Sequence, residues 1–280
     1  MTLVNLDLDK DGRVIGPRND KMLIVDADTI VYASCSVCEY ELPDGGFDIN
    51  IHEALAHAED KINRIVDAVE GKEENLHLHF TGGKASFRYQ LLADAFPDEP
   101  EMHYKFKRKK KKVPEGLHQL KVLLNEKHKG DIHYEWEADD QVVFDKKKYG
   151  DDAILIAVDK DVLYNVPGKH YNYYESRLYN IDPKWVEVNS DEARFDQYIQ
   201  AITGDKSDNI PGIKGIGPAK ARKFLVDGMD EDELYQGVLN AYETHHKRLD
   251  ISPEDMAILN IRLVNMHQLT DEGVVLWEQV

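Results

Sequence analysis

The feature that most constrains the fold is a run of six apolar residues, Ala153-Ile154-Leu155-Ile156-Ala157-Val158, which ends at Asp159. A run this short and this uniformly apolar is typical of a buried parallel strand. Met22-Leu23-Ile24-Val25, which ends at Asp26, has the same character. The two runs predict a sheet covered on both faces.

The segments between and around these runs alternate between the sequence patterns of strands and those of helices. Further strands are expected at 76–80 and 132–136, and helices at 29–40, 52–70, 117–127 and 138–149. Strands that alternate with helices give a mostly parallel sheet flanked by helices, so the predicted class is α/β. After about residue 190 a helix at 191–203 leads into a Gly/Pro-rich stretch and more helical segments, which predicts a small helical subdomain.

Length and composition agree with this organisation. The 280 residues suffice for one large α/β domain with an appendage, which we divide into an extension at 1–20, a main domain at 21–190 and a helical subdomain at 191–280. No stretch approaches the roughly 20 apolar residues of a membrane helix, and the first 21 residues lack the apolar run of a secretory signal. We therefore expect a cytoplasmic protein, without a membrane partner, in which Cys35 and Cys38 pack in the core.

The charge distribution is uneven. The net charge is −18, from 35 basic and 53 acidic residues, which alone argues against a polyanionic partner. However, seven of the eight residues from Lys105 to Lys112 are basic. Such a run suits either a solvated face or a nucleic-acid contact. Contact with DNA becomes reasonable if divalent metal ions neutralise the acidic residues elsewhere.

Acidic residues follow three of the expected strands. In open α/β sheets, ligands bind at the carboxyl ends of the strands, so these acids should meet at one edge. The loop at 204–209 adds two more acids, spaced three residues apart. The candidate metal ligands are Asp26, Glu137, Asp139, Asp140, Asp159, Asp161, Asp205 and Asp208.

Each of these acids taken alone also suits a helix N-cap. Their convergence favours metal binding instead, because gathered carboxylates repel one another and a hard cation such as Mg²⁺ or Mn²⁺ relieves that repulsion. Two such ions form a standard device for phosphodiester hydrolysis. We expect Asp26, Glu137, Asp139, Asp140 and Asp159 around one ion and Asp161, Asp205 and Asp208 around the other, with Asp140 and Asp159 as alternative bridging residues.

A glycine-rich turn follows the last of these acids. Gly212, Gly215 and Gly217 stand where backbone approaches a neighbour closely, and a helix with Lys220 comes next. Backbone N–H groups at such a helix start suit a phosphate, and they bind a DNA strand without sequence preference.

These motifs together resemble the 5′-nuclease superfamily over roughly residues 21–228. LIVDADTIVY, WEADDQVVF, AVDKDVL and GDKSDNIPG are similar to its acidic motifs, and the glycine-rich turn is similar to its helix–three-turn–helix element. The resemblance implies a PIN-like domain with a helical arch near 84–116. Tyr104, Lys105 and Arg108 match the arch motif, whose Lys and Arg contact the scissile phosphate. It also implies a K⁺ ion at the helix–three-turn–helix.

The implied activity is that of a 5′→3′ exonuclease or 5′-flap endonuclease on duplex or branched DNA, acting as a monomer in phage replication or recombination, in the host cytoplasm if phage-encoded. One departure stands out, because the second strand ends in Phe80-Thr81-Gly82-Gly83-Lys84 where many relatives have a metal-binding Asp. Asp28 is the candidate substitute. The alternatives are a DNA-structure-binding protein that has lost catalysis and a nuclease acting on the RNA of RNA–DNA hybrids.

Overall fold

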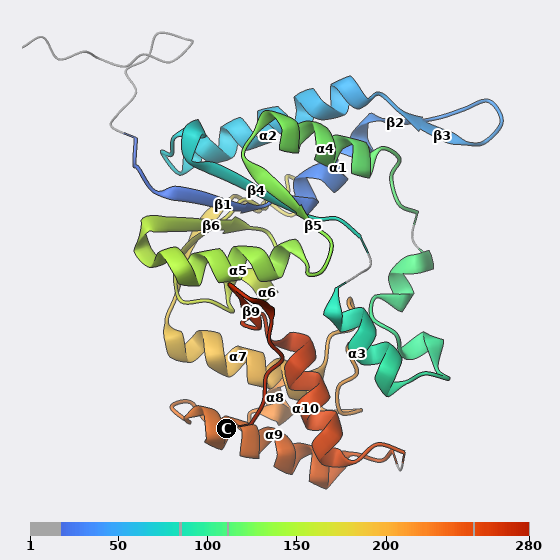
Figure 1. Cartoon of the computed structure of the whole chain (residues 1–280), viewed down its shortest axis with the longest axis vertical. Coiled ribbons are helices and arrows are strands. Elements are labelled where there is room, and N and C mark those ends of the chain that lie inside the picture. Colours follow the sequence, from blue (N-terminus) through green and yellow to red (C-terminus); the bar gives the residue numbers. More distant parts are fainter. Residues whose placement is uncertain (1–17, 84–85, 111, 249, 280) are drawn as a thin grey trace, which may run out of the picture.

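The computed structural model describes residues 18–83, 86–110, 112–248 and 250–279, so most of the expected extension at 1–20 lies outside the described residues. A six-stranded sheet with helices on both faces lies beside a group of helices from the C-terminal third of the chain (Figure 1). The sheet is built from β1 (Met22–Asp26), β4 (Leu76–Thr81), β5 (Gly130–His133), β6 (Ala153–Ala157), β7 (Gly168–Asn172) and β8 (Lys184–Val188).

The strand order is β5-β4-β1-β6-β7-β8, and all neighbours are parallel except β7 and β8. The mostly parallel α/β class is therefore confirmed. β1 lies at the centre, where Val25 pairs with Leu78 on one side and Ile156 on the other. This order places the carboxyl ends of β1, β4 and β6 next to one another.

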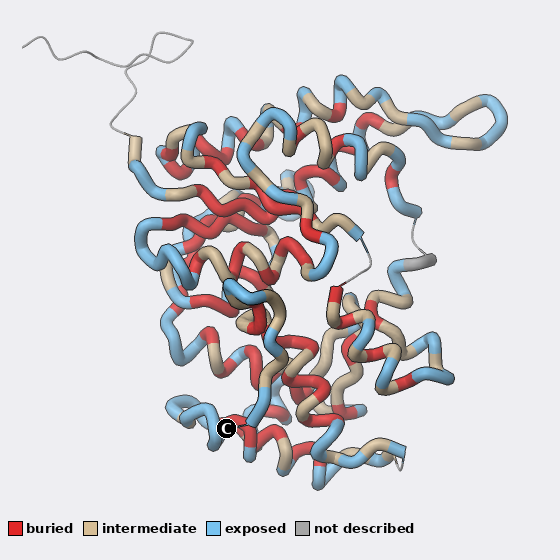
Figure 2. The backbone as a smooth tube through the Cα atoms, in the orientation of Figure 1, coloured by how far each residue is buried: buried red, intermediate tan, exposed pale blue. Residues whose placement is uncertain are grey.

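Alternate residues of β1 face the two layers of helices, because successive side chains of a strand point to opposite faces. Leu23 and Val25 pack with α1 (Asp28–Cys38), α2 (Ile51–Ala68) and α4 (Leu117–Lys127). Ile24 packs on the other face, against α5 (Ala138–Tyr149) and α6 (Lys160–Leu163). Figure 2 shows the strands as a continuous buried layer. Cys35 and Cys38 are buried on α1, as expected for core residues.

The helical group has its own apolar core. Tyr198 of α7 (Ser190–Thr203), Val238 of α9 (Glu231–His245) and Ile261 of α10 (Pro253–Val264) belong to it, together with the short α8 (Pro218–Ala221). Leu92 of α3 (Phe87–Ala95) is buried in the same core, although it belongs to the segment expected to form the arch. In Figure 1, α3 lies beside α10. The base of the arch segment thus packs on the helical subdomain.

Several elements differ from expectation. The strand expected at 132–136 is β5, which ends at His133, and residues 134–136 form a bend before α5. β7, β8 and the hairpin of β2 (Glu39–Glu41) and β3 (Phe47–Ile49) were not expected, because exposed polar residues interrupt their apolar pattern. The chain ends in a hairpin of β9 (Leu269–Thr270) and β10 (Gly273–Val274) rather than a helix.

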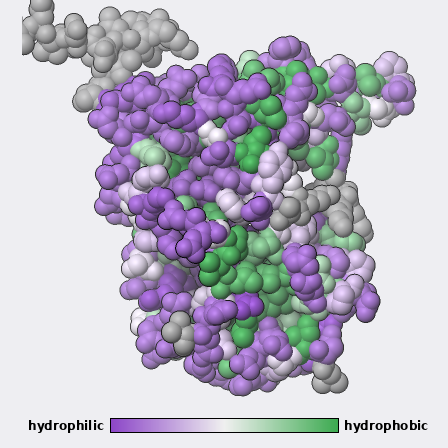
Figure 3. All heavy atoms as spheres, in the orientation of Figure 1, coloured by the Kyte–Doolittle hydropathy of each residue, from purple (hydrophilic) through white to green (hydrophobic). Residues whose placement is uncertain are grey.

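The arch segment contains less helix than the resemblance implies. Beyond α3, the described residues of this segment form two short 3₁₀ helices, η2 (Pro100–Met102) and η3 (Phe106–Lys110). Two further 3₁₀ helices lie elsewhere, η1 (Glu73–Asn75) and η4 (Gly150–Asp152). The face of the molecule in Figure 3 is mostly hydrophilic. No helix in the described part of the chain has the length and apolar character needed to cross a bilayer.

Candidate functional site

A cavity of about 390 Å³ opens at the carboxyl edge of the sheet, between the strand ends and the segment around Lys105. The ends of β1, β4 and β6, the start of α5 and the loop after α7 all contribute to its wall. Six carboxylates line it: Asp26, Asp28, Glu137, Asp139, Asp159 and Asp208. Three cationic residues line it as well: Lys105, Arg108 and Lys121. The predicted convergence of acids from distant segments is therefore present for five of the eight expected ligands.

Local backbone geometry fixes two of these acids. Asp159 follows β6, and its carboxylate accepts a hydrogen bond of 2.8 Å from the Asp161 amide, which caps α6. Asp26 ends β1, and its Oδ1 accepts a bond of 3.2 Å from the Asp28 amide. Asp159 shows that an N-cap and a pocket-lining position are compatible, because a capping carboxylate keeps free lone pairs.

The pocket carries more buried negative charge than its surroundings compensate. Burial and the charge of Asp28 raise the pKa of Asp26 to about 7. Burial and the charges of Asp26 and Glu137 raise the pKa of Asp139 well above its ordinary value. Carboxylates forced together in this way favour either protonation or a bound cation.

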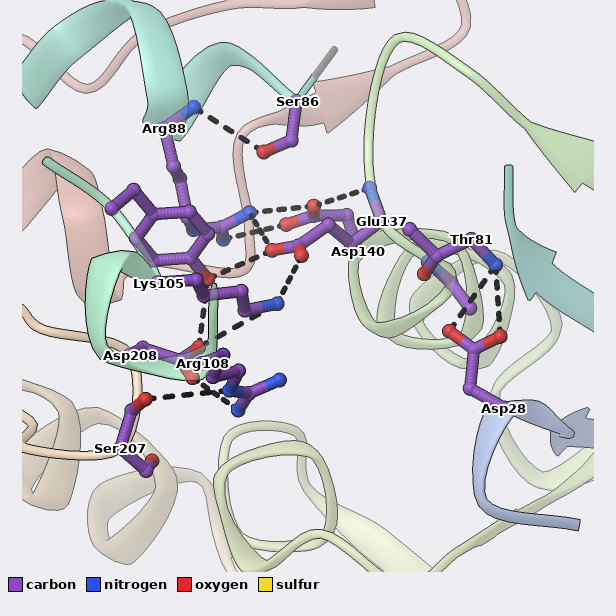
Figure 4. A network of polar contacts seen from close by, with 12 residues as sticks. Asp28, Thr81, Ser86, Arg88, Lys105, Arg108, Glu137, Asp140, Ser207 and Asp208 are labelled. Carbon is purple, nitrogen blue, oxygen red and sulfur yellow. Dashed lines mark hydrogen bonds and ion pairs between the residues drawn. The ribbon is translucent and has the colours of Figure 1, made fainter. Parts of the chain in front are cut away.

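Two basic side chains from the predicted arch segment reach into the pocket (Figure 4). Lys105 forms an ion pair with Glu137, and its Nζ lies 3.7 Å from Asp208. Arg108 forms an ion pair with Asp208. Burial favours the neutral form of Glu137, but Lys105 and Arg88 outweigh it and lower the pKa of this carboxyl.

The backbone of this segment is also tied to the loop after α7. The Lys105 amide donates to the Asp208 carbonyl at 2.7 Å, and Lys105 has a φ of +53°, in the left-handed region. Such a conformation costs roughly 1 kcal/mol or more for a residue with a side chain, and it persists where surrounding contacts impose it. The Tyr104 hydroxyl lies 2.8 Å from both Glu137 and Asp208. Tyr104, Lys105 and Arg108 thus contact Glu137 and Asp208, and the expected contact of Lys105 and Arg108 with a phosphate stays a prediction.

Three expected ligands lie outside the cavity wall. Asp140 is buried against Arg88, with both oxygens 2.7 Å from the guanidinium. Asp161 accepts a bond of 2.9 Å from Gln200, and burial and the charge of Asp159 raise its pKa to about 7. Asp205 accepts bonds from the Ser207 amide at 2.6 Å and the Ser207 hydroxyl at 2.7 Å.

Asp161 and Asp205 nevertheless lie close enough to influence each other. Burial opposes ionisation of Asp205, but the bonds from Ser207 and a contact with Asp161 outweigh it and lower the pKa of Asp205. The charge of Asp205 in turn helps to raise the pKa of Asp161. The two therefore form a second acidic pair beside the cavity, next to Asp159.

The donor set suits a hard divalent cation in chemistry, because all these ligands are carboxylate oxygens and the pKa values of three of them are raised. In the described ranges, no group of three His, Cys, Asp or Glu side chains stands in metal-binding geometry. Glu137 and Asp208 instead face Lys105 and Arg108. The basic side chains thus neutralise part of the acidic pocket.

Comparison with curated proteins gives relatives of two kinds. DNA polymerase I of Streptococcus pneumoniae strain R6 is 23% identical over 262 residues, 88% of this chain and 28% of that protein. Flap endonuclease Xni of Shewanella piezotolerans is 25% identical over 170 residues, 58% of this chain and 66% of that protein. The chain spans between 14% and 28% of the length of the DNA polymerase I relatives. No protein-family model matches the chain.

Solved structures show the same fold. A T5 5′-exonuclease with bound zinc superposes with a TM-score of 0.60 at 18% identity, over 88% of this chain and 89% of that one. The catalytic core of Rad2 in complex with a DNA substrate gives 0.51 at 15% identity, over 91% and 76%. In sequence the chain is similar to DNA polymerase I and flap endonuclease Xni, and in fold it is similar to the T5 5′-exonuclease.

The chain departs from the expected motif at the end of β4, where Thr81 stands in place of a carboxylate. The Thr81 amide lies 3.2 Å from both oxygens of Asp28, so the Asp28 carboxylate sits directly against the end of β4. Lys121 of α4 donates to Asp28 and to the Thr81 carbonyl, both at 2.6 Å. Lys121 was not anticipated, because nothing in its helical context distinguishes it from a surface lysine.

The glycines of the turn have different roles. A Cβ on Gly212 would lie 2.1 Å from the Thr203 carbonyl, so close backbone packing within the protein requires glycine there. Gly215 has a φ of +83°, and space is open around both Gly215 and Gly217. Lys220, on the four-residue α8, donates to the Gly215 carbonyl at 2.8 Å. Exposed backbone for a ligand is thus confined to the second half of the turn.

Proposed function

We propose that the chain is a metal-dependent nuclease that hydrolyses phosphodiester bonds at 5′ ends or 5′ flaps of DNA. The observation that carries the proposal is the cavity at the sheet edge, where six carboxylates from four parts of the chain meet Lys105 and Arg108. A bound cation would relieve the repulsion between carboxylates whose pKa values are raised. The cationic side chains beside them can bind a negatively charged phosphate. A site for both is what phosphodiester hydrolysis requires.

The relatives support DNA as the substrate. Flap endonuclease Xni is a nuclease by name, and T5 flap endonuclease and Rad2 have been solved in complex with DNA. The match to the T5 proteins covers 88% of this chain. We carry the substrate class over from these proteins, and we propose that the protein acts as a monomer in the cytoplasm, in replication or recombination.

Two Mg²⁺ or Mn²⁺ ions are the proposed cofactors. Asp26, Glu137, Asp139, Asp159 and Asp208 would hold them from the cavity wall, and Asp161 and Asp205 would contribute from the adjacent acidic pair. Asp28 would supply the carboxylate that β4 lacks, because it is held against Thr81. Bound ions would polarise the phosphate and activate the attacking water. A K⁺ ion beside the glycine-rich turn is part of the same proposal.

The basic side chains of the arch segment would act on the scissile phosphate. Lys105 and Arg108 are paired with Glu137 and Asp208, so divalent ions at those carboxylates would free both cations. The freed side chains would stabilise the negative charge that develops on the phosphate oxygens. Tyr104, hydrogen-bonded to the same two carboxylates, would hold them in register.

The glycine-rich turn would bind the backbone of the duplex at a distance from the cleaved bond. Gly215 and Gly217 leave backbone accessible, and Lys220 lies beside them. Contacts of this kind recognise the DNA backbone rather than its bases. The turn is linked to the arch segment, since the Asn209 side chain donates to the Glu101 and His103 carbonyls at 2.8 and 2.9 Å.

The deciding experiment incubates the protein with a 5′-labelled duplex that carries a 5′ flap, in Mg²⁺, in Mn²⁺ and in EDTA. We expect metal-dependent release of a mononucleotide or a short flap, and the product length separates an exonuclease from a flap cutter. An RNA–DNA hybrid in parallel tests the substrate class. Intact DNA that still shifts on a gel would contradict the proposal and identify a DNA-binding protein without catalysis.

A further inference from the structure

Arg88 is the most deeply buried cation near the site, with 2% of its surface exposed. It lies in the first turn of α3, at the base of the arch segment. Its Nη1 and Nη2 donate to the two oxygens of Asp140, each at 2.7 Å, in a bidentate pair. Its Nε donates to the Leu263 carbonyl at 2.8 Å, and Nη2 also donates to the Asn265 carbonyl at 3.3 Å.

The Asp140 carboxylate accepts three hydrogen bonds in this arrangement, two on Oδ2 and one on Oδ1. Besides Arg88, its Oδ2 accepts a bond of 3.2 Å from the Glu137 amide, and its side chain is 1% exposed. A metal ion that took the lone pairs facing Arg88 would displace the guanidinium, and a buried guanidinium without its partner is strongly destabilising. Asp140 therefore serves the ion pair, although it lies beside Asp139 in the acidic motif.

Both members of the pair act on Glu137. Asp140 fixes the Glu137 backbone at the start of α5, and Arg88 Nη1 lies 3.6 Å from the Glu137 carboxylate. Figure 4 shows the guanidinium pointing at Asp140 and Glu137 from the side opposite Asp28. The same guanidinium is bonded to the end of α10, so α3, α5 and α10 meet at one side chain.

We propose that Arg88 and Asp140 are positioning residues that orient Glu137 for catalysis, and that Asp140 is not a metal ligand. The pair couples the arch segment and the helical subdomain to the carboxylate that faces Lys105. This inference rests on the proposed nuclease function. It reassigns Asp140, which the acidic motif alone places among the metal ligands.

The test uses the full chain with three variants. Arg88→Met/Asp140→Leu replaces the pair by apolar side chains of similar volume, a change that buried ion pairs often tolerate. Arg88→Lys keeps the charge but removes the bidentate fork. Asp26→Asn is the control for loss of a ligand. The readouts are the melting temperature, the Mn²⁺ dissociation constant from the electron paramagnetic resonance of free Mn²⁺, and kcat and KM on flap DNA.

We expect the double variant to weaken Mn²⁺ binding less than Asp26→Asn does, because Asp26→Asn removes a proposed ligand whereas the double variant only loosens the orientation of Glu137. We expect the kcat of the double variant to fall about 30-fold and its KM to stay within about threefold of wild type. This loss of kcat should occur even if the melting temperature of the double variant equals that of wild type. Loss of Mn²⁺ affinity comparable to Asp26→Asn would make Asp140 a ligand and overturn the proposal. Wild-type kcat in a folded double variant would reduce the pair to a structural role and overturn it too.

If the double variant does not fold, the Arg88→Lys variant tests whether the pair positions Glu137. A lower kcat at unchanged KM and unchanged Mn²⁺ affinity supports positioning, and an unchanged kcat overturns it. If wild type itself cuts no DNA, the proposed function fails. The Mn²⁺ affinity of the variants then still decides whether Asp140 is a ligand.

Discussion

Two polar clusters lie along β4, and they are built in opposite ways. The acidic pocket is the set of six carboxylates that line the cavity, whose charges oppose one another. The histidine network consists of His79, His133, Trp136, Gln141 and Asp145, and its members complement one another. His79 lies 3.1 Å from His133 and 3.2 Å from Asp145. Gln141 donates to Asp145 and accepts from Trp136, both at 3.0 Å.

This difference suggests that the histidine network stabilises the fold, whereas the acidic pocket serves a ligand. Buried polar groups that find partners within the protein stabilise it. Hydrogen bonds link His79 to His133, Trp136 to Gln141 and Gln141 to Asp145, although Nε2 of His79 makes none among the described residues. Buried carboxylates that repel one another destabilise the metal-free protein, so they make physical sense only with a ligand that the protein does not itself provide. A substitution in the pocket should therefore affect activity more than stability, and one in the network should do the reverse.

The largest expected effect comes from matched Asp→Asn substitutions in the two clusters. Asp139→Asn should lower the single-turnover cleavage rate about 10³-fold, because it removes a charge from the proposed metal site. Asp145→Asn should leave the rate within about threefold, but lower the melting temperature by roughly 4 °C, because His79 loses a charged partner. Labelled flap DNA and thermal melts measure the two effects. Equal losses of activity in both variants would remove the distinction.

The next effect tests the basic side chains that balance the acidic pocket. Lys105→Ala should slow cleavage about 100-fold while DNA affinity changes less than about fivefold, because the ammonium acts mainly on charge that develops in the transition state. Lys107→Ala is the matched control, since Lys107 is exposed in the same basic run. It should change the rate less than about threefold. A larger effect from Lys107 would mean that the run acts through general charge.

A smaller effect concerns the carboxylate that β4 lacks. Asp28→Asn should weaken Mn²⁺ binding and slow cleavage, each about tenfold, because we propose that Asp28 takes the place of the absent strand-end acid. Adding Thr81→Asp to that variant should restore part of both losses, since Thr81 lies against Asp28. Titration with Mn²⁺ and flap cleavage measure them. Normal affinity and rate in Asp28→Asn would exclude Asp28 from the metal site.

The sequence predicted the parts of the molecule that local patterns encode. Apolar runs that end in Asp26 and Asp159 marked β1 and β6, and the rule for strand ends brought their acids to one edge. The partners of those acids are not local. Lys121 meets Asp28 from 93 positions away, and Arg88 meets Asp140 from 52. Such pairs follow from tertiary packing. The acidic motif alone therefore could not show that Asp140 pairs with Arg88 while Asp139 lines the cavity.

The sheet shows the same limit. β7 and β8 lie at one edge, where Lys169 and Glu187 face solvent and interrupt the apolar run. β1 and β6, buried on both faces, have no such interruption. A strand that is buried on both faces is therefore easier to predict from the sequence than a strand at the edge of the sheet.

The smallest expected effect is a dependence on pH that differs in sign between the two clusters. Burial and the neighbouring His79 lower the pKa of His133 to about 4. Between pH 4 and about 6.5 the unfolded chain binds a proton that the folded protein does not, so this contribution to stability is present above pH 6.5 and lost toward pH 4. Asp26, with a pKa raised to about 7, has the opposite dependence.

The two dependences are separated by comparing wild type with His133→Gln, which leaves the acidic pocket unchanged. The free energy of unfolding lost by the substitution should be smaller at pH 5 than at pH 7.5, by at most about 2 kcal/mol because the ring keeps some contact with solvent. Urea denaturation in EDTA at both pH values measures this difference. The same loss at both pH values would mean that His133 is protonated to the same extent in the folded and unfolded chains. The two clusters would then not differ in the sign of their pH dependence in the way that these pKa shifts imply.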